Sequence, residues 1–561
     1  MKKDFAPGKA CPAYRSTCKL FGEGTLLSPY GIHFSDHSTT LANPLLERVD
    51  LDGPTLNTKT VATDGATTIA FKLAGIATDV VEAKAVIVNG QIGPTAASRF
   101  YGMVGSAMYE AQQIYDSSEQ TGLGRSDTNL EKLARNSLKG ITPESRETFI
   151  DNVIAYATAG VMRQEATEGA TIVEAGLLEA LQDLGESADK AAKKVGNAVA
   201  REVLRFYERD GSRATSSYSP ANSSPTDTSQ LDRWTPEYNV GGDPDSGIQS
   251  FLTPQWGEVK QILGKQQLKA LQAELKSPEP FLLDPLASHD AKAGTITRAD
   301  GTTITIDASL IGIDINPEFI AQAQRVVDAS AELTDKEKLI AEFWEDGPGT
   351  GFPPGTWMEF GRYASELYDN TRQEDVRMFF GIGQALLSAG VSAWGLKTET
   401  DYARPLTAIR ELSRLGLLRD EDPDTAGVQV FAYNRQTQET DLISGIDWET
   451  YQTPGNFYSP PFAEFTSGHS TFSASAGRLI ELITGRSNFG ASVTTTSLIE
   501  KDKLGLEPVT LSWETWKDAW VESGDSRIFG GIHFDDGNKQ GVLNGERIGD
   551  AVFAQVSQLW A

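Results

Sequence analysis

The sequence predicts a mainly α-helical protein, made of two packed helical bundles with minor β-hairpin content. Three observations lead to this prediction. Apolar residues recur at helical spacing through most of the chain after Gly93, only one short pair of threonine- and isoleucine-rich runs has strand character, and no internal repeat of fixed period occurs. With 561 residues, the chain is long enough for two or more lobes, each with its own apolar core.

Three regions follow one another along the chain. Residues 1–90 are rich in Gly, Pro, Thr and Asp and show little helical periodicity, so we expect an irregular N-terminal arm there. Residues 91–300 and 301–561 are expected to form the N-terminal and C-terminal helical bundles, the second of which carries the candidate site. An apolar stripe predicts the first core helix of the N-terminal bundle: Phe100, Val104, Ala107, Met108, Ala111, Ile114 and Tyr115.

The remaining helices are predicted from periodic segments, and the breaks between them from turn-forming residues. The segment 211–230 is full of Ser, Pro, Thr and Asn, which predicts an exposed loop. Residues 295–297 and 303–306 flank an Asp-Gly turn, which predicts a β-hairpin. The expected helices span 145–163, 171–208, 258–275, 316–329, 335–345, 357–368, 374–396, 405–416, 469–484, 513–522 and 538–558.

Composition and charge exclude several classes of function. The formal net charge of −27 argues against nucleic-acid and anionic-membrane partners, because both require clustered Lys and Arg. The mean hydropathy of −0.31 is that of a soluble globular protein, and no uninterrupted run of about 18 apolar residues predicts a bilayer-spanning helix. The N-terminus lacks the apolar segment of a signal peptide. We therefore expect a cytoplasmic protein, or an exported one if the N-terminus is processed or truncated.

The two cysteines, Cys11 and Cys18, are too few for a thiolate metal cage or a disulfide scaffold. One bridge between them in an oxidising compartment and two unpaired thiols remain alternatives. The oligomeric state is equally open, with a homo-oligomer among the alternatives.

Two basic residues of the C-terminal half form the first motif. Lys397 and Arg404 are seven residues apart, which places them on one side of a continuous helix. Pro405 predicts that this helix ends nearby, so that Arg404 lies at an end from which it can reach inward. Taken alone, the two residues would be a solvated basic pair.

Two of the five histidines lie in two further motifs. In Ser467-Gly468-His469, a loop opens into a helix-compatible run, which offers free backbone N–H groups at the positive end of a helix dipole. Taken alone, this motif is explained by a simple N-cap. The segment Ser526–His533 contains a Gly pair that could turn Arg527 and His533 toward one point.

Together the three motifs predict an oxyanion site. Lys397, Arg404 and Arg527 bring three positive charges into an acidic protein. Arginine suits bidentate contact with a tetrahedral oxyanion, and lysine acts as a point charge. His469 adds a proton-transfer group, and His533 can bond the central atom.

The pattern Lys-x6-Arg-Pro, Ser-Gly-His and Arg-x5-His resembles the signature shared by vanadium-dependent haloperoxidases and type 2 phosphatidic acid phosphatases. The likeness to bacterial haloperoxidases covers most of the chain beyond about residue 90. It extends to Gly93-Pro94-Thr95, Met108-Tyr109, Leu252-Thr253-Pro254-Gln255-Trp256-Gly257 and Phe343-Trp344-Glu345-Asp346-Gly347-Pro348-Gly349.

The resemblance implies vanadate as the cofactor and assigns the residues that hold it. His533 would be the axial ligand through Nε2. The equatorial oxygens would be held by Lys397, Arg404, Ser467, the Gly468 N–H and Arg527.

The resemblance also implies hydrogen peroxide, a halide and a small organic acceptor as reaction partners. His469 would take a proton from peroxide, Lys397 would polarise one of its oxygens, and Asp346 would support the acid–base network. Trp394 and Phe462 would lie beside the halide. The expected product is hypohalous acid, which halogenates the organic acceptor.

Two positions depart from the family pattern. The usual Pro before Ser-Gly-His is Thr466, and the Asp that phosphatases place four residues after the final His is Gly537. Asp535 and Asp536 are close but out of register. The alternative function, an acid phosphatase with a phospho-histidine intermediate, normally requires that Asp to orient its nucleophile. The sequence therefore favours the haloperoxidase.

Overall fold

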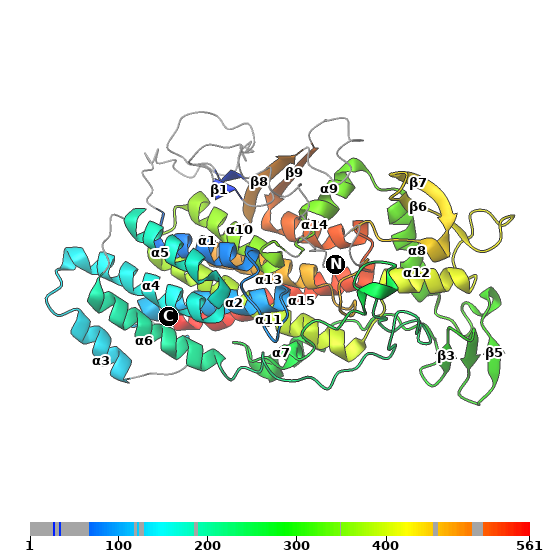
Figure 1. Ribbon diagram of the computed structural model, residues 1–561, viewed down its shortest axis with the longest axis horizontal. Helices are drawn as coiled ribbons and strands as arrows, with labels where there is room; N and C mark the ends of the chain where they lie inside the picture. The colour runs from blue at the N-terminus through cyan, green and yellow to red at the C-terminus, as the bar shows by residue number, and fades with distance from the viewer. Residues whose placement is uncertain are drawn as a thin grey trace, which may run out of the picture.

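The computed structural model describes residues 26–27, 33–34, 67–116, 121–122, 128–183, 189–347, 349–452, 458–495 and 509–560. In these ranges the chain forms fifteen α-helices and small antiparallel sheets of two or three strands, which confirms the mainly α prediction (Figure 1). Cys11, Cys18 and most of the expected N-terminal arm lie outside the described residues.

The N-terminal helices begin earlier than expected. Helix α1 lies inside the region expected to be irregular, so that prediction is wrong for these residues: Thr68 caps α1, and eleven of its fourteen residues are buried. The predicted helix over 171–208 is two helices, the second capped by Asp189, whose carboxylate accepts from two backbone N–H groups. The helices are α1 (Ile69–Glu82), α2 (Pro94–Gln113), α3 (Thr128–Ser137), α4 (Pro143–Glu165), α5 (Ala170–Asp183) and α6 (Lys190–Tyr207).

The middle of the chain holds short helices and one small sheet. The predicted hairpin is confirmed, with Ile296 opposite Ile304, and a third strand not predicted from the sequence pairs with its first strand. The segment 211–230 has no regular structure, as predicted. The elements are α7 (Gly264–Gln272), β3 (Ser288–Asp290), β4 (Thr295–Thr297), β5 (Thr303–Thr305), α8 (Pro317–Ala331), α9 (Asp335–Phe343) and α10 (Phe352–Tyr368).

The C-terminal part contains the longest helix and the elements that build the site. Two hairpins, β6–β7 and β8–β9, lie between its helices and were not predicted. The elements are α11 (Arg372–Thr400), α12 (Pro405–Arg414), β6 (Gln429–Asn434), β7 (Glu439–Ser444), α13 (Gly468–Thr484), β8 (Asn488–Thr495), β9 (Val509–Thr515), α14 (Trp516–Phe529) and α15 (Asp535–Ser557).

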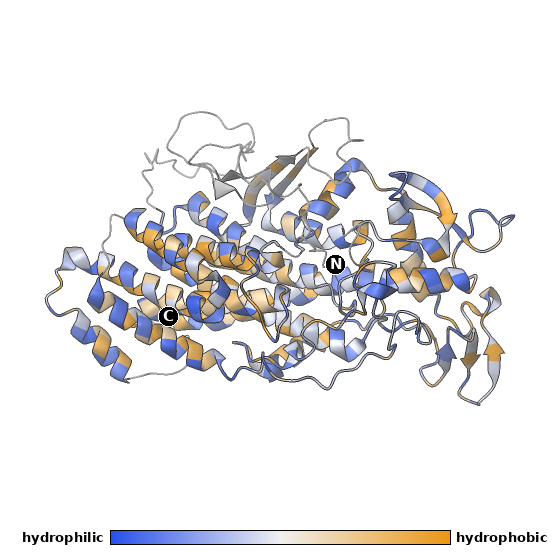
Figure 2. Cartoon of the chain, viewed as in Figure 1, coloured by the Kyte–Doolittle hydropathy of each residue, from blue (hydrophilic) through white to orange (hydrophobic). Residues whose placement is uncertain are grey.

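Helix α11 packs against α2, α13 and α15 through the middle of the elongated molecule, with α3–α6 at one end and β3–β7 at the other (Figure 1). Apolar residues concentrate on these central helices (Figure 2). Glycines allow close approach: a Cβ on Gly105 would lie 2.6 Å from the Phe379 carbonyl oxygen, and one on Gly383 would lie 2.6 Å from that of Tyr101. The largest core includes residues from both expected bundles, and the boundary near residue 300 stays a prediction.

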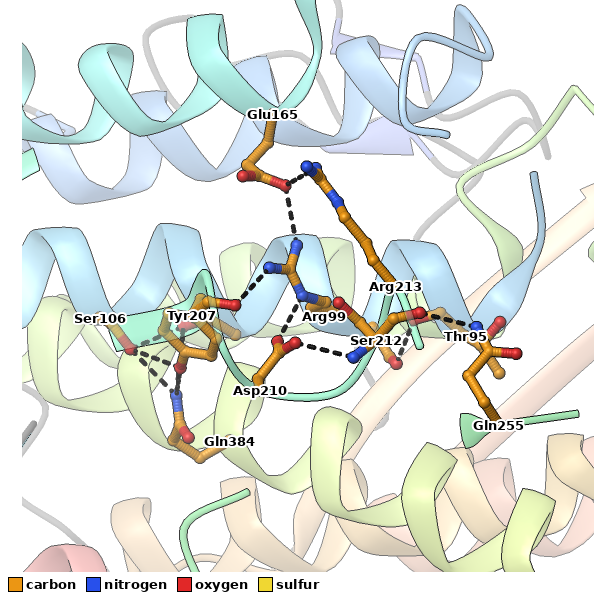
Figure 3. A network of polar contacts seen from close by, with 12 residues as sticks. Thr95, Arg99, Ser106, Glu165, Tyr207, Asp210, Ser212, Arg213, Gln255 and Gln384 are labelled. Carbon is orange, nitrogen blue, oxygen red and sulfur yellow. Dashed lines mark hydrogen bonds and ion pairs between the residues drawn. The ribbon is translucent and has the colours of Figure 1, made fainter. Parts of the chain in front are cut away.

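A buried polar network fixes the segments that support the candidate site (Figure 3). Arg99 on α2 donates to Asp210, Glu165 and the Tyr207 carbonyl. Near the start of α2, the Thr95 hydroxyl lies 2.8 Å from that of Thr253. These bonds hold α2 against the 207–213 and 252–256 segments.

Helix α11 is the one described helix that is long and apolar enough to cross a membrane. Its apolar window is 94% buried inside the protein, which is the environment of a core helix. Its last turn carries Lys397 and so links the core to the candidate site.

Candidate active site

Four helix ends bring the three sequence motifs together. Lys397 lies in the last turn of α11, and Arg404 precedes the first residue of α12. Ser467 is the N-cap of α13, and His533 lies in the short turn between α14 and α15. The structure thus brings residues up to 136 positions apart in the sequence to one buried place.

Lys397 is fully buried and donates two hydrogen bonds to the chain. Its Nζ lies 2.8 Å from the carbonyl oxygens of both Ala463 and Glu464. An ammonium has three N–H groups, so one remains for a ligand. Burial and the neighbouring Arg404 lower the pKa of Lys397 well below its ordinary value, and Glu464 opposes this. An anion in the pocket would favour the charged ammonium.

Arg404 reaches inward, as the position of Pro405 predicted. Its Nε donates to the Phe462 carbonyl at 2.9 Å and its Nη1 to the Ile532 carbonyl at 2.8 Å. Its Nη2 is buried with no hydrogen-bond partner among the described residues. Burial lowers the pKa of Arg404 to about 10, against the opposing effect of nearby carboxylates. A buried guanidinium with an unused donor is a strong anion-binding group.

The Ser-Gly-His motif forms the turn into α13. Ser467 Oγ accepts from the Ser470 N–H, and the Ser467 N–H donates to the Gly537 carbonyl at 3.0 Å. Gly468 is the first helical residue, so its N–H has no partner within the helix. A Cβ at Gly468 would lie 3.5 Å from the Trp394 ring. The peptide bond before Thr466, the residue in place of the usual Pro, is cis.

His469 lies between a hydrogen-bond acceptor and a donor. Its Nε2 is 3.2 Å from the Glu345 carbonyl oxygen and 3.3 Å from Arg527 Nη1. The carbonyl can pair only with a protonated Nε2, whereas the guanidinium can pair only with an unprotonated one. Burial and Arg527 lower the pKa of His469 well below its ordinary value. This nitrogen is therefore supported in both protonation states, as a proton-transfer group requires.

Arg527 and Asp346 flank this histidine. Arg527 is fully buried near the end of α14, and its Nη2 donates to the Ala341 carbonyl. Asp346 follows Glu345 in the chain and accepts from the Thr356 hydroxyl at 2.8 Å. Whether Asp346 acts on the proton-transfer network stays a prediction.

His533 has a tautomer fixed by its two neighbours. Arg404 Nη1 lies 3.1 Å from Nε2, and arginine can only donate, so Nε2 carries the lone pair. Nδ1 then carries the proton and donates to Glu464 Oε1 at 2.7 Å. Burial and the positive charges of Arg404 and Lys397 lower the pKa of His533 well below its ordinary value. The unprotonated Nε2 can therefore act as a ligand.

Trp394 and Phe462 form an aromatic wall beside the cations. Their ring centroids are 4.8 Å apart, and Lys397 Nζ lies 5.1 Å from the Phe462 ring centroid. The Trp394 Nε1–H donates to the Leu252 carbonyl, in the loop that the Arg99 network supports. Their role as a halide pocket stays a prediction.

Sequence reasoning missed Glu464. Its side chain is completely buried against His533, and burial raises its pKa to about 7 although Lys397 and Arg404 lower it. The sequence offered one signal, Gly537, which stands where the phosphatase pattern has an Asp. A carboxylate from another segment can take the place of that missing Asp. Glu464 lies only five residues before His469.

The donor set fits a tetrahedral oxyanion such as vanadate or phosphate. Arg404 contacts His533 Nε2, and the buried Lys397 and Arg527 also act electrostatically on this histidine. Arg404 Nη2 and the amides that begin α13 supply donors that a bound anion would satisfy.

Comparisons with known proteins identify a related domain and similar folds. Residues 377–561 match the sequence model of the VCPO second helical-bundle domain. No curated protein sequence matches the chain.

Several solved structures share the fold over most of their length. A holo-type bacterial vanadium-dependent chloroperoxidase has 18% identity and a TM-score of 0.59, covering 84% of this chain and 94% of that one. An apo-type bacterial vanadium-dependent chloroperoxidase has 17% identity and a TM-score of 0.60, covering 83% and 95%. A bacterial vanadium-dependent iodoperoxidase has 18% identity and a TM-score of 0.56, covering 86% and 95%. Residues 377–561 thus match the VCPO second helical-bundle domain, and the chain has the fold of the bacterial vanadium-dependent chloro- and iodoperoxidases.

Proposed function

We propose that this chain is a vanadate-dependent haloperoxidase that oxidises a halide with hydrogen peroxide to hypohalous acid. The observation that supports it most directly is His533 Nε2, which holds a lone pair beside Arg404 in a pocket of buried cations. The proteins with similar folds include chloro- and iodoperoxidases described as vanadium-dependent.

The cofactor would be held by the groups at the four helix ends. His533 Nε2 would bond the vanadium, and Arg404 Nη2 would donate to an oxygen of the vanadate. The other contacts would come from Lys397, Ser467, Gly468 and Arg527. When bound, vanadate would supply the Lewis acid that activates peroxide.

The protein's own residues would accept the proton of peroxide and stabilise the negative charge on its oxygen. His469 Nε2 would take the proton of peroxide, since Glu345 and Arg527 support its protonated and unprotonated states in turn. Lys397 would stabilise negative charge on a peroxide oxygen through its third N–H. Halide would approach along the wall formed by Trp394 and Phe462, where the nearby ammonium attracts an anion. The hypohalous acid formed would then halogenate a small organic acceptor.

An acid phosphatase is the alternative, and one observation favours it. The sequence argument against it was the absence of a carboxylate for its nucleophilic histidine, but Glu464 supplies one to His533. In this alternative His533 would attack phosphate and His469 would protonate the leaving group. Assaying one preparation for both reactions separates the two: halide oxidation that depends on orthovanadate supports the haloperoxidase. Hydrolysis of a phosphate monoester, inhibited by orthovanadate and without halide oxidation, supports the phosphatase.

A further inference from the structure

We propose that Glu464 is the positioning residue of His533, a carboxylate delivered from the segment before α13 to the place that an aspartate on α15 would otherwise take. The inference rests on the proposed function, because it concerns the same oxyanion site. It assigns a residue outside the three motifs that define that site.

The contact between the two side chains is short and shielded from water. Glu464 Oε1 lies 2.7 Å from His533 Nδ1 and also accepts from the Phe534 N–H at 3.1 Å. The Glu464 side chain is 0% exposed and that of His533 is 2% exposed. A buried carboxylate on Nδ1 fixes the ring orientation and the tautomer, and it makes Nε2 more basic.

Gly537 provides the space that this arrangement needs. A Cβ at this position would lie 2.0 Å from Glu464 Oε1 and 2.5 Å from Oε2, so any other residue would displace the carboxylate from this place. Its φ is not positive, so the backbone conformation does not require glycine. Glycine in a helix is less favourable than alanine. Room for the Glu464 carboxylate is therefore the physical reason for glycine here.

Glu464 also acts on a second pocket residue through its backbone. Its carbonyl oxygen accepts from Lys397 Nζ at 2.8 Å, and its own N–H donates to the Tyr402 carbonyl at 3.0 Å. One residue thus fixes Lys397 with its main chain and His533 with its side chain. Side-chain variants of Glu464 change only the second of these contacts.

The test exchanges the carboxylate between the two segments. We compare Glu464→Ala, Glu464→Gln and the double variant Glu464→Ala/Gly537→Asp with the wild-type chain. The readouts are the tautomer of His533, from ¹⁵N-histidine NMR assigned with His533→Ala, and calorimetric affinities for orthovanadate and orthophosphate. Circular dichroism and the Tm establish that each variant is folded.

In Glu464→Ala, His533 is expected to lose its fixed Nδ1–H tautomer. This variant is also expected to bind orthovanadate about 10–100-fold more weakly. The double variant is expected to recover the tautomer and most of the affinity, which a merely structural role of Glu464 would not predict. A folded Glu464→Ala with the wild-type tautomer and affinity would overturn the proposal, as would a folded double variant without recovery. If Glu464→Ala does not fold, the isosteric Glu464→Gln decides. A several-fold loss of affinity supports the role, and unchanged affinity overturns it.

Failure of this inference and failure of the proposed function give different results. Tautomer and orthophosphate affinity require no halide oxidation, so both can change in Glu464→Ala even if the wild-type chain oxidises no halide. Conversely, wild-type halide oxidation with an unaffected Glu464→Ala would leave the function standing and remove the role of Glu464.

Discussion

Arg404 Nη1 lies 3.1 Å from Nε2 of His533, although both side chains are buried and both are basic. The contact is favourable only while His533 is neutral, since a guanidinium repels an imidazolium. A bound oxyanion would replace this contact, because it can accept from Arg404 and bond to Nε2. The pair is thus arranged for an anion.

Arg404→Lys should weaken binding of orthovanadate and orthophosphate by about tenfold or more. Lysine keeps a positive charge but loses the planar fork and the buried Nη2 donor. Calorimetric titration measures the loss. Arg414→Lys, exposed at the other end of α12, is the matched control and should bind normally. Equal affinities in the two variants would show that Arg404 does not contact the anion.

Alanine variants of the two site histidines should have different effects, one on catalysis and the other on orthovanadate binding. His469→Ala should reduce halide oxidation by about 10²–10⁴-fold and retain orthovanadate, because it removes a proton-transfer group. His533→Ala should lose orthovanadate itself. Dialysis against orthovanadate followed by metal analysis, with turnover measured on the same samples, distinguishes these results. Full activity in either variant would remove the corresponding assignment.

Phe462→Leu should raise the KM for halide several-fold and leave orthovanadate affinity unchanged. The substitution removes the ring that lies 5.1 Å from both Lys397 Nζ and Arg404 Cζ, and with it the aromatic wall beside the cations. Initial rates at varied bromide concentration give the KM. An unchanged KM would place the halide elsewhere.

Gly545→Ala should destabilise the fold by about 1–3 kcal/mol, through overpacking between α15 and α13. A Cβ there would lie 2.6 Å from the Thr471 carbonyl oxygen. Gly395→Ala on α11 is the control, because its nearest neighbour would lie 3.5 Å away. Thermal unfolding should show a lower Tm for Gly545→Ala alone. A similar Tm for both variants would contradict the close packing of these helices.

Glu82→Gln should stabilise the protein at alkaline pH. Burial, together with Asp79 and Glu359, raises the pKa of Glu82 to about 8. Its folded pKa thus exceeds the unfolded value, so the stability it contributes is present below about pH 4.5 and is lost as pH rises through 8. The Tm of Glu82→Gln should exceed that of the wild type at pH 9 and match it near pH 4.5. Exposed Glu514→Gln is the surface control. A Tm difference between Glu82→Gln and the wild type that stays constant across pH would contradict a buried, ionised Glu82 at alkaline pH.

The sequence predicted most of the helices because helical periodicity is a local pattern, but α1 and α3 (Thr128–Ser137) were not predicted. Apolar residues at helical spacing indicate the buried face of a helix. The position of Arg404 between two helices was predicted because Pro405 limits the preceding helix. Helix α10 begins five residues before its predicted start, because Pro353 and Pro354 lie in its first turn, where their missing N–H groups cost nothing.

Other features depend on contacts between distant segments and have no local signature. The role of Glu464 depends on the space above Gly537, 73 residues later in the chain. Helix α1 was missed because the composition of the whole region 1–90 obscured one apolar stretch, Ile69–Glu82.

The most direct test of the central claim is the bromination of monochlorodimedone by hydrogen peroxide and bromide. The protein is first stripped with chelator and phosphate, and the assay is run with and without added orthovanadate. The account predicts turnover only with orthovanadate, and repetition with chloride and iodide then ranks the halides. The contrary result is no turnover under either condition, in a folded protein that hydrolyses a phosphate monoester and is inhibited by orthovanadate. It would contradict the haloperoxidase proposal and identify the oxyanion site as that of a phosphatase.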